Sequence, residues 1–484
     1  MLLGMWTAAW IVSACGTGER TADTSDAAGG SGGGGTGGGA TGGGGSAGGG
    51  GNADAGGLMD AGDGDSGDPD AGTGPCVDIH ILPSMLPEPE KWYGIGPTIG
   101  VSADRDHIWR DANGLHVAWN PVPADASGPV LVVSSFDPAT GAVLKHRFFP
   151  DGGRKVVNST SLGPDNTVGL AVGWVPPDGG AGGHALLVFS TSDSSEALYP
   201  LPPWPEPGEY SLVGVGWDGE AFAVHAWKQN VQYVTRIQPD GTVLLPPTAF
   251  GKAYGYVSEI RYATDTVSGV TVAVSGFSAN FPWLTGHLRD GTPVPDPAKI
   301  QGIQLEPQNW LGVDGGWAGG TTRPAIAAIA GGAGVAWSSG SALSPITTFV
   351  QGLGASLETT ANAIGFPGEA IPSPGPGQPK QYTGMNWLTV QQRAGGGWWV
   401  AGNDSNAIIE HIADGPGNLQ RRALVTFSKA PQWGFAVTDF ESTHGNDELW
   451  LAFMDRSSSE EVPFRVIRAH PACTYSSMYD LIGQ

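Results

Sequence analysis

The stretch "DANGLHVAW", residues 111–119, joins a turn to a short apolar run that ends in Val117-Ala118-Trp119. Asp, Asn and Gly are typical turn residues, and the β-branched and aromatic residues after them favour a strand. The same order occurs in "WDGEAFAV" and "GGAGVAW" further along the chain. The pattern therefore predicts the second strand of a β-hairpin, and the small central residue of the triplet predicts close packing between layers.

Seven variants of this triplet follow one another along the chain. They are Val117-Ala118-Trp119, Val172-Gly173-Trp174, Phe222-Ala223-Val224, Val272-Ala273-Val274, Val335-Ala336-Trp337, Val400-Ala401-Gly402 and Leu451-Ala452-Phe453. Their middle residues are 55, 50, 50, 63, 65 and 51 positions apart, so the unit is 50 to 65 residues long. A period of this kind is the signature of a repeat architecture.

Most units contain two further strand patterns after the triplet. Third strands are expected in "VLVVSSF" (130–136), "ALLVFS" (185–190), "QYVTRI" (232–237), "WLTGHL" (283–288), "AIIEHI" (407–412) and "FRVIRA" (464–469). A turn and a fourth strand are expected in "DPATGAVL" (137–144), "QPDGTVLL" (238–245), "RDGTPVP" (289–295) and "ADGPGNL" (413–419). Four antiparallel strands per unit, seven times and with no helix pattern between them, predict an all-β fold, a seven-bladed β-propeller.

A stack of β-sandwiches is the alternative fold. In the propeller, Trp119, Trp174 and Trp337 are expected to wedge between neighbouring blades as part of the core.

The last unit lacks a fourth strand of its own, because Cys473 follows its third strand and no turn signal leads onward. "VDIHIL", residues 77–82, alternates apolar and polar residues like a strand and directly follows Cys76. We expect it to complete the last blade, with a Cys76–Cys473 disulfide in place of the missing turn. The alternatives are two free thiols, and a last strand donated by the tail "TYSSMYDLIG", residues 474–483.

Composition excludes several classes of protein. The chain has 46 Asp and Glu against 23 Lys and Arg, a net charge of -23, which repels nucleic acid and anionic lipid headgroups. We therefore expect no nucleic-acid partner. No run of 18 apolar residues occurs, so no transmembrane helix is expected.

The first 14 residues, "MLLGMWTAAWIVSA", are uncharged and apolar, which predicts a signal peptide. The last three of these residues together with the next one, Val12-Ser13-Ala14-Cys15, resemble the lipobox of bacterial lipoproteins. The resemblance implies cleavage before Cys15, a diacylglycerol on its sulfur and a lipid anchor as the only membrane contact. Gly16 in the next position implies sorting to the outer membrane. An ordinary secretory signal is the alternative.

Residues 15–75 are expected to be a disordered tether, and residues 76–484 the propeller domain. Residues 29–51 contain 17 Gly among 23 positions, too few apolar side chains for a core. The acidic run "DAGDGDSGDPDAG", residues 60–72, departs from the order of an EF-hand loop. It therefore predicts a solvated linker and no metal site.

Motifs of known catalytic chemistry are missing. There is no G-x-S-x-G outside the linker, no cysteine left for a Cys-His pair and no H-E-x-x-H among the ten histidines. "SADRDHIW", residues 102–109, resembles the Asp box of sialidases in Ser102, Asp104 and Trp109. In those families the box is a turn away from the active site, so the resemblance transfers no catalytic residue. We expect no catalytic residue, metal or cofactor.

In propellers generally, ligands bind the face made by the loops between second and third strands and between successive blades. These loops contain the expected ligand-binding residues Trp204, Trp283, Trp310, Asp404 and Asn406. Rigid aromatic rings beside amides and carboxylates suit sugar stacking or contact with a protein. For each Trp, the alternative is that it caps its own loop.

These features predict a lipid-anchored surface module that binds a carbohydrate or protein ligand. The alternatives are a secreted carbohydrate-active enzyme, a glycoside hydrolase or lyase with carboxylates at the channel mouth, and a structural scaffold of an envelope complex.

Overall fold

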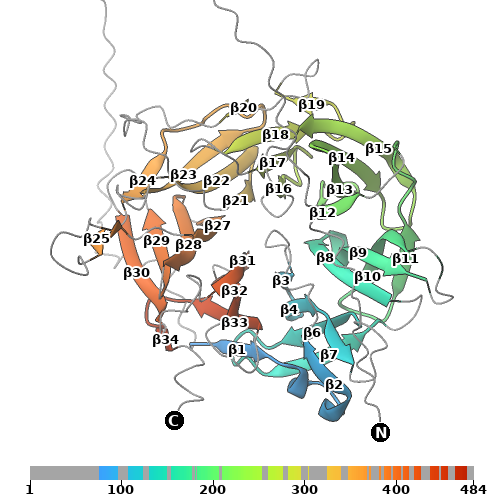
Figure 1. Cartoon of the computed structure of the whole chain (residues 1–484), viewed down its shortest axis with the longest axis horizontal. Coiled ribbons are helices and arrows are strands. Elements are labelled where there is room, and N and C mark those ends of the chain that lie inside the picture. The colour runs from blue at the N-terminus through green and yellow to red at the C-terminus, as the bar shows by residue number, and fades with distance from the viewer. Residues whose placement is uncertain are drawn as a thin grey trace, which may run out of the picture. The chain divides into compact units, whose positions relative to one another are not determined.

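The protein is a seven-bladed β-propeller, seen along its axis in the computed structural model of Figure 1. The predicted fold is confirmed. The structure describes residues 76–95, 107–123, 130–149, 154–176, 180, 182–206, 210–252, 260–275, 282–295, 303–304, 324–339, 347–367, 370–371, 381–382, 386–393, 396–404, 407–413, 419–426, 437–445, 448–455 and 464–476.

In the first six blades, four strands follow chain order and pair antiparallel. The first blade contains β3 (Ile108–Asp111), β4 (Gly114–Trp119), β6 (Val132–Phe136) and β7 (Val143–Phe148). The second contains β8 (Arg154–Leu162), β9 (Thr167–Val175), β10 (Gly183–Ser190) and β11 (Glu196–Pro200). The third contains β12 (Ser211–Trp217), β13 (Phe222–Lys228), β14 (Val231–Ile237) and β15 (Val243–Lys252).

The remaining blades repeat this arrangement. The fourth contains β16 (Ile260–Thr264), β17 (Thr271–Ser275), β18 (Trp283–His287) and β19 (Pro293–Val294), and β20 (Ile303–Gln304) also pairs with β18. The fifth contains β21 (Ala325–Ile329), β22 (Gly332–Ser339), β23 (Thr347–Gly354) and β24 (Ile364–Pro367). The sixth contains β27 (Asn386–Gln392), β28 (Trp398–Asp404), β29 (Ala407–Ala413) and β30 (Leu419–Thr426). The seventh contains β31 (Val437–Gly445), β32 (Glu448–Asp455), β33 (Phe464–Ala469) and β1 (Asp78–Ile81).

Short elements decorate the ring. They are the two-stranded sheets β2 (Trp92–Ile95) with β5 (Pro121–Pro123) and β25 (Ala370–Ile371) with β26 (Gln381–Tyr382), and the 3-10 turns η1 (Pro83–Met85), η2 (Pro89–Lys91) and η4 (Pro164–Asn166). Among the described residues, no helix is long and apolar enough to cross a bilayer.

All seven triplets lie in the second strand of their blade, as predicted. Six of them carry a central alanine that is at most 1% exposed, at positions 118, 223, 273, 336, 401 and 452. A small side chain here lets the sheet of the next blade approach closely. The six expected third strands are also confirmed, whereas β23, "TTFVQGLG", was not predicted because its two glycines weaken the strand pattern.

One apolar cluster fills each of the seven contacts between neighbouring blades. Trp119 is fully buried in the cluster that joins the first and seventh blades, and Trp337 in the one that joins the fourth and fifth. Trp174 is half-buried against the cluster between the first and second blades. The tryptophans therefore pack between blades, as the repeat pattern indicates.

The two ends of the chain close the ring together. β1 pairs antiparallel with β33, with Asp78 opposite Ile467 and Ile81 opposite Phe464. A disulfide joins Cys76 to Cys473, whose Cα atoms are 5.4 Å apart. The predicted closure and bond are confirmed, and the alternative of two free thiols is wrong.

A buried ion pair reinforces this closure. Arg465 is fully buried, and its Nη2 and Nε donate to the two Asp78 carboxylate oxygens at 2.6 and 3.2 Å. A buried guanidinium needs such a partner, because its desolvation would otherwise cost several kcal/mol.

The tail does not supply the last strand, so that alternative is also wrong. Tyr475 and Ser476 form β34, which pairs parallel with β30 and adds a fifth strand to the sixth blade. The reason is that β1 already occupies the free edge of β33. The Arg468 backbone N–H also donates to the Val77 carbonyl at 3.1 Å.

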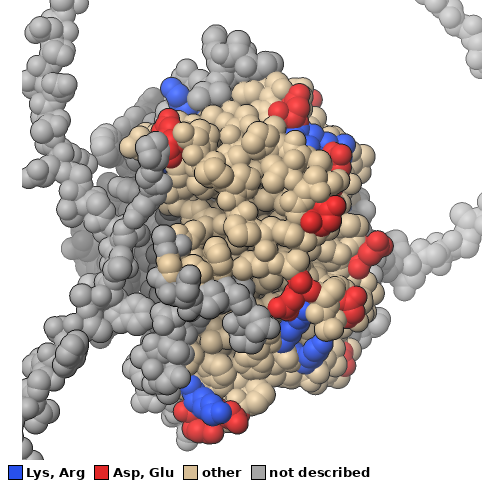
Figure 2. Space-filling model, turned by 90° about the vertical axis from the view of Figure 1, so that its right-hand side faces the viewer, with Lys and Arg blue, Asp and Glu red and all other residues tan. Residues whose placement is uncertain are grey.

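The outer strands end the blades at the rim of the ring, where unpaired edges would invite association. Figure 2 shows the side of the ring formed by β11 and β15, where uncharged residues cover most of the surface. Proline, which has no N–H to donate, occurs in four of these outer strands, at Pro200, Pro246, Pro247, Pro293 and Pro367. At these positions the outer strands therefore offer no backbone N–H to a strand of another molecule.

Candidate functional site

Two of the expected ligand-binding residues have described side chains. Trp204 lies between β11 and β12, and Trp283 is the first residue of β18; both are half-buried. Trp204 thus belongs to a connection between blades, and Trp283 follows a connection between second and third strands. Both kinds of connection form the face of the propeller on which these residues were expected. The backbone of Asp404 ends β28, while its side chain, Trp310, Asn406 and Cys15 lie outside the described residues.

Trp204 belongs to an aromatic group that we call the Trp204 cluster, made of Trp204, Glu206, Tyr210, Lys228 and Tyr233. The indole stacks on the Tyr210 ring at 5.1 Å and meets the Tyr233 ring edge-on at 6.3 Å. The Lys228 ammonium lies 4.8 Å above the Tyr210 ring and 3.6 Å from the Glu206 carboxylate. The Glu206 backbone N–H donates to the Tyr210 hydroxyl at 3.3 Å.

The hairpin beside this cluster explains its position. Gln229 and Asn230 connect β13 to β14 with φ of 46° and 67°. Two positive φ values are those of a type I′ turn, which matches the twist of the strands it joins. The exposed amide side chains of this turn therefore lie next in sequence to Lys228 and close to Tyr233.

Burial and the Tyr210 hydroxyl raise the pKa of Tyr233 to about 12. The phenol is thus neutral at physiological pH and can donate a hydrogen bond. The Trp204 cluster combines a half-exposed aromatic ring with an ammonium, a carboxylate and, beside them, two amides.

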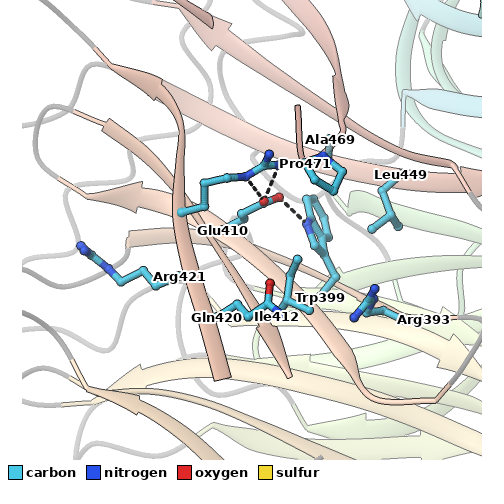
Figure 3. A pocket seen from close by; sticks show the side chains of 10 residues that line it. Arg393, Trp399, Glu410, Ile412, Gln420, Arg421, Leu449, Ala469 and Pro471 are labelled. Carbon is cyan, nitrogen blue, oxygen red and sulfur yellow. Dashed lines mark hydrogen bonds and ion pairs between the residues drawn. The ribbon is translucent and has the colours of Figure 1, made fainter. Parts of the chain in front are cut away.

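A pocket of about 290 Å³ lies between the sixth and seventh blades (Figure 3). It lies on the face of the ring opposite to the Trp204 cluster. It is lined by Arg393, Trp399, Glu410, Ile412, Gln420, Arg421, Arg422, Leu449, Ala469 and Pro471. Arg393 and Trp399 flank the connection between first and second strands, whereas Trp204 lies beside a connection between second and third strands. These two kinds of connection lie at opposite ends of a blade.

Glu410 organises the pocket. Its carboxylate accepts the Trp399 indole N–H at 3.0 Å and the Arg422 Nε at 2.5 Å. Arg422 Nη1 also donates to the His470 carbonyl at 2.7 Å, which ties the sixth blade to the segment after β33. We did not predict this site from the sequence, although opposite charges in the adjacent strands "IIEHI" and "LQRRAL" were a usable signal, since Glu410 and Arg422 are cross-strand partners.

A serine–histidine–aspartate chain crosses the first blade. His116 Nδ1 lies 2.8 Å from the Ser135 hydroxyl, and His116 Nε2 lies 2.8 Å from the Asp111 carboxylate. Asp111 also accepts the Thr191 hydroxyl of the second blade at 2.7 Å. Acyl transfer needs free donors for the oxyanion, but Ser135 sits in mid-strand between ladders to β4 and β7. The chain therefore ties two blades together.

A second buried polar group joins the third and fourth blades. The Nε2 atoms of His225 and His287 are 3.0 Å apart, and His225 stacks on Tyr262 at 4.3 Å. Burial lowers the pKa of His287 to about 4 and that of His225 well below its usual range. In the part of the chain that the structure describes, no group of three or more His, Cys, Asp or Glu residues is arranged to hold a metal ion.

No protein-family model and no curated protein matches this chain. Among solved structures it is similar to the polysaccharide lyase Uly1, with TM-score 0.45, 9% identity and 81% of this chain and 99% of that chain covered. A fungal alcohol oxidase of the AA5 family in complex with copper has TM-score 0.45 and 10% identity over 82% of this chain and 76% of that one.

The β-propeller domain of the Trilobed protease from Pyrococcus furiosus has TM-score 0.38 and 6% identity over 78% of this chain and 93% of that one. At this level of similarity none of these proteins identifies a ligand or an activity. The candidate sites are therefore interpreted from their own residues.

Proposed function

We propose that the protein is a surface binding module that recognises carbohydrate at the Trp204 cluster. The stacked, half-exposed indole of Trp204 is the observation that carries this proposal. An aromatic ring offers a flat apolar surface to the C–H face of a sugar, and the neighbouring charged and amide groups of Glu206, Lys228, Gln229 and Asn230 suit its hydroxyls.

Rigidity supports the same function. Tyr210 and Tyr233 hold the Trp204 indole from two directions, and Tyr210 is itself fixed by the Glu206 backbone and the Lys228 ammonium. A side chain that is already ordered loses little conformational entropy when a ligand binds, so more of the contact energy remains as affinity.

A glycan array probed with the full-length protein tests this proposal. We expect retention of a subset of glycans, weakened at least about tenfold by Trp204→Ala, since removal of one stacked aromatic ring costs on the order of 1.4 kcal/mol or more. Trp217→Ala is the matched control, because Trp217 is another half-buried tryptophan of the third blade but lies at the opposite end of β12.

Each other outcome has a definite meaning. No retained glycan, or equal loss with both variants, contradicts the carbohydrate site. Cleavage of a retained polysaccharide into shorter products would favour the alternative of a carbohydrate-active enzyme. Selective capture of one envelope protein in the absence of glycan would favour a protein ligand or an envelope scaffold.

We also propose that residues 1–14 are removed and that Cys15 carries the lipid that anchors the protein to the outer membrane. The glycine-rich residues 15–75 would then tether the propeller to the lipid. Labelling with a palmitate analogue tests the anchor: the wild type should be labelled and Cys15→Ala should not. Label that persists in Cys15→Ala, or an unlabelled wild type, contradicts it.

A further inference from the structure

The pocket between the sixth and seventh blades is basic in a strongly acidic protein. Three of its lining residues are arginines and one is a glutamate, whereas the whole chain has a net charge of -23. Arg421 borders the pocket, but its side chain extends to the other side of β30 (Figure 3). Among the described residues that line the pocket, the inward charges are therefore those of Arg393, Arg422 and Glu410, which sum to +1.

The pocket is also preorganised. Glu410 is bonded to Arg422 and Trp399, so its negative charge is compensated inside the wall. Arg393 is only 8% exposed, and its guanidinium stands at the pocket beside Trp399 (Figure 3). A guanidinium has five N–H donors, so Arg393 can keep its intramolecular partners and still bind an anion.

The remaining walls limit the size and character of a ligand. Ile412, Leu449, Ala469 and Pro471 are apolar, while Gln420 adds an amide. The volume of about 290 Å³ lies at the lower end of the range for small-molecule pockets, about 300–1,000 Å³, so the pocket suits a small organic ligand. A single sugar unit has this size.

We propose that this pocket is a second binding site, which takes the carboxylate of an acidic sugar unit, a uronic acid. We infer the carboxylate of the ligand from the residues of the pocket, with Arg393 as its partner. That the rest of the ligand is a sugar rests on the proposed function. The site is on the opposite face from the Trp204 cluster, so an acidic glycan could engage the two sites independently.

Calorimetric titration of the full-length protein with sodium glucuronate tests the site, with glucose and the non-sugar carboxylate benzoate as comparison ligands. We expect binding of glucuronate and none of glucose. Arg393→Gln should weaken glucuronate binding at least about tenfold, because a charge-assisted hydrogen bond contributes on the order of 1.5–3 kcal/mol. Lys145→Gln is the control, since it removes the same charge from an exposed position of β7 in the first blade and should leave binding unchanged.

Ala469→Leu provides a second variant, because it narrows the pocket without changing its charge and should also abolish binding. Thermal melts of each variant establish that it is folded before titration. No binding of glucuronate, or equal weakening by Arg393→Gln and Lys145→Gln, overturns the site even if glycans are retained at the Trp204 cluster. Equal affinity for benzoate and glucuronate overturns the sugar assignment. Loss of glycan binding in Trp204→Ala with glucuronate binding intact leaves both sites standing.

Discussion

Reduction of the Cys76–Cys473 bond should destabilise the whole ring, because the bond holds the two ends of the chain at one blade. The bonded residues are 397 positions apart. For a closed loop of this length, the chain-entropy model gives about 6 kcal/mol at 25 °C, and measured disulfides more often contribute about 2–4 kcal/mol. We therefore expect the free energy of unfolding to fall by about 2 to 6 kcal/mol.

The change Cys76→Ser isolates this effect. Cys76 is exposed, so the substitution leaves no cavity, whereas Cys473 is fully buried among apolar residues of the sixth and seventh blades. The β1 strand keeps its ladder to β33 and the Asp78–Arg465 ion pair in both states. The expected loss thus comes from the unfolded chain regaining its freedom and not from lost native contacts.

Guanidinium denaturation followed by tryptophan fluorescence measures the difference, with and without a phosphine reductant. The reduced wild type should unfold at the same lower denaturant concentration as Cys76→Ser, and the reductant should not affect Cys76→Ser. A reduced wild type with the midpoint of the oxidised protein would refute the reasoning, since the closure would then be held by β1 pairing alone.

Two other predictions concern contacts between blades. A Cβ on Gly169 would lie 2.6 Å from the Phe222 ring, so Gly169→Ala should lower stability by about 1–3 kcal/mol. Gly183→Ala, in the neighbouring strand with nothing within 4 Å, should be neutral or up to about 1 kcal/mol stabilising in the same denaturation assay. His287 takes up a proton in the unfolded chain near pH 6.5 but in the folded protein only near pH 4, because it is buried against His225. Stability should therefore be complete above pH 6.5 and fall by up to about 3 kcal/mol between pH 6.5 and 4, with a smaller fall in His287→Gln.

The repeat and the closure were predictable because each depends on local pattern. A turn, a β-run and a small residue recur in every unit, and a strand pattern beside Cys76 matches a unit that lacks one. The role of β34 was not predictable, since "TYSS" has the same β-propensity whichever edge it joins. The decisive fact was the occupation of the β33 edge by β1, which is a property of the assembled ring.

Of the candidate sites, only Trp204 could be found from sequence, because a tryptophan in a proline-rich loop is a local signal. The contacts that make it rigid come from Tyr210, in the same connection between blades, and from Tyr233, on β14. The pocket requires even more distant residues: Arg393 and Leu449 are 56 positions apart and belong to different blades. Their approach follows from blade geometry and from no motif.

The position of the pocket has a physical cause in the way the ring closes. In the third blade a tight turn, in which the Gln238 N–H donates to the Thr242 carbonyl at 2.9 Å, leads from the third strand directly into the fourth. In the seventh blade the fourth strand comes from the other end of the chain, so the segment after β33 is free to run elsewhere.

The segment after β33 turns at His470, where the Cys473 N–H donates to the His470 carbonyl at 2.9 Å, and continues to β34 on the sixth blade. This path places Pro471 over the space between the two blades and presents the His470 carbonyl to Arg422. The pocket therefore arises at the blade in which the disulfide replaces a turn. There the segment after β33 leaves its own blade, so the contact between the sixth and seventh blades differs from the other contacts in the ring.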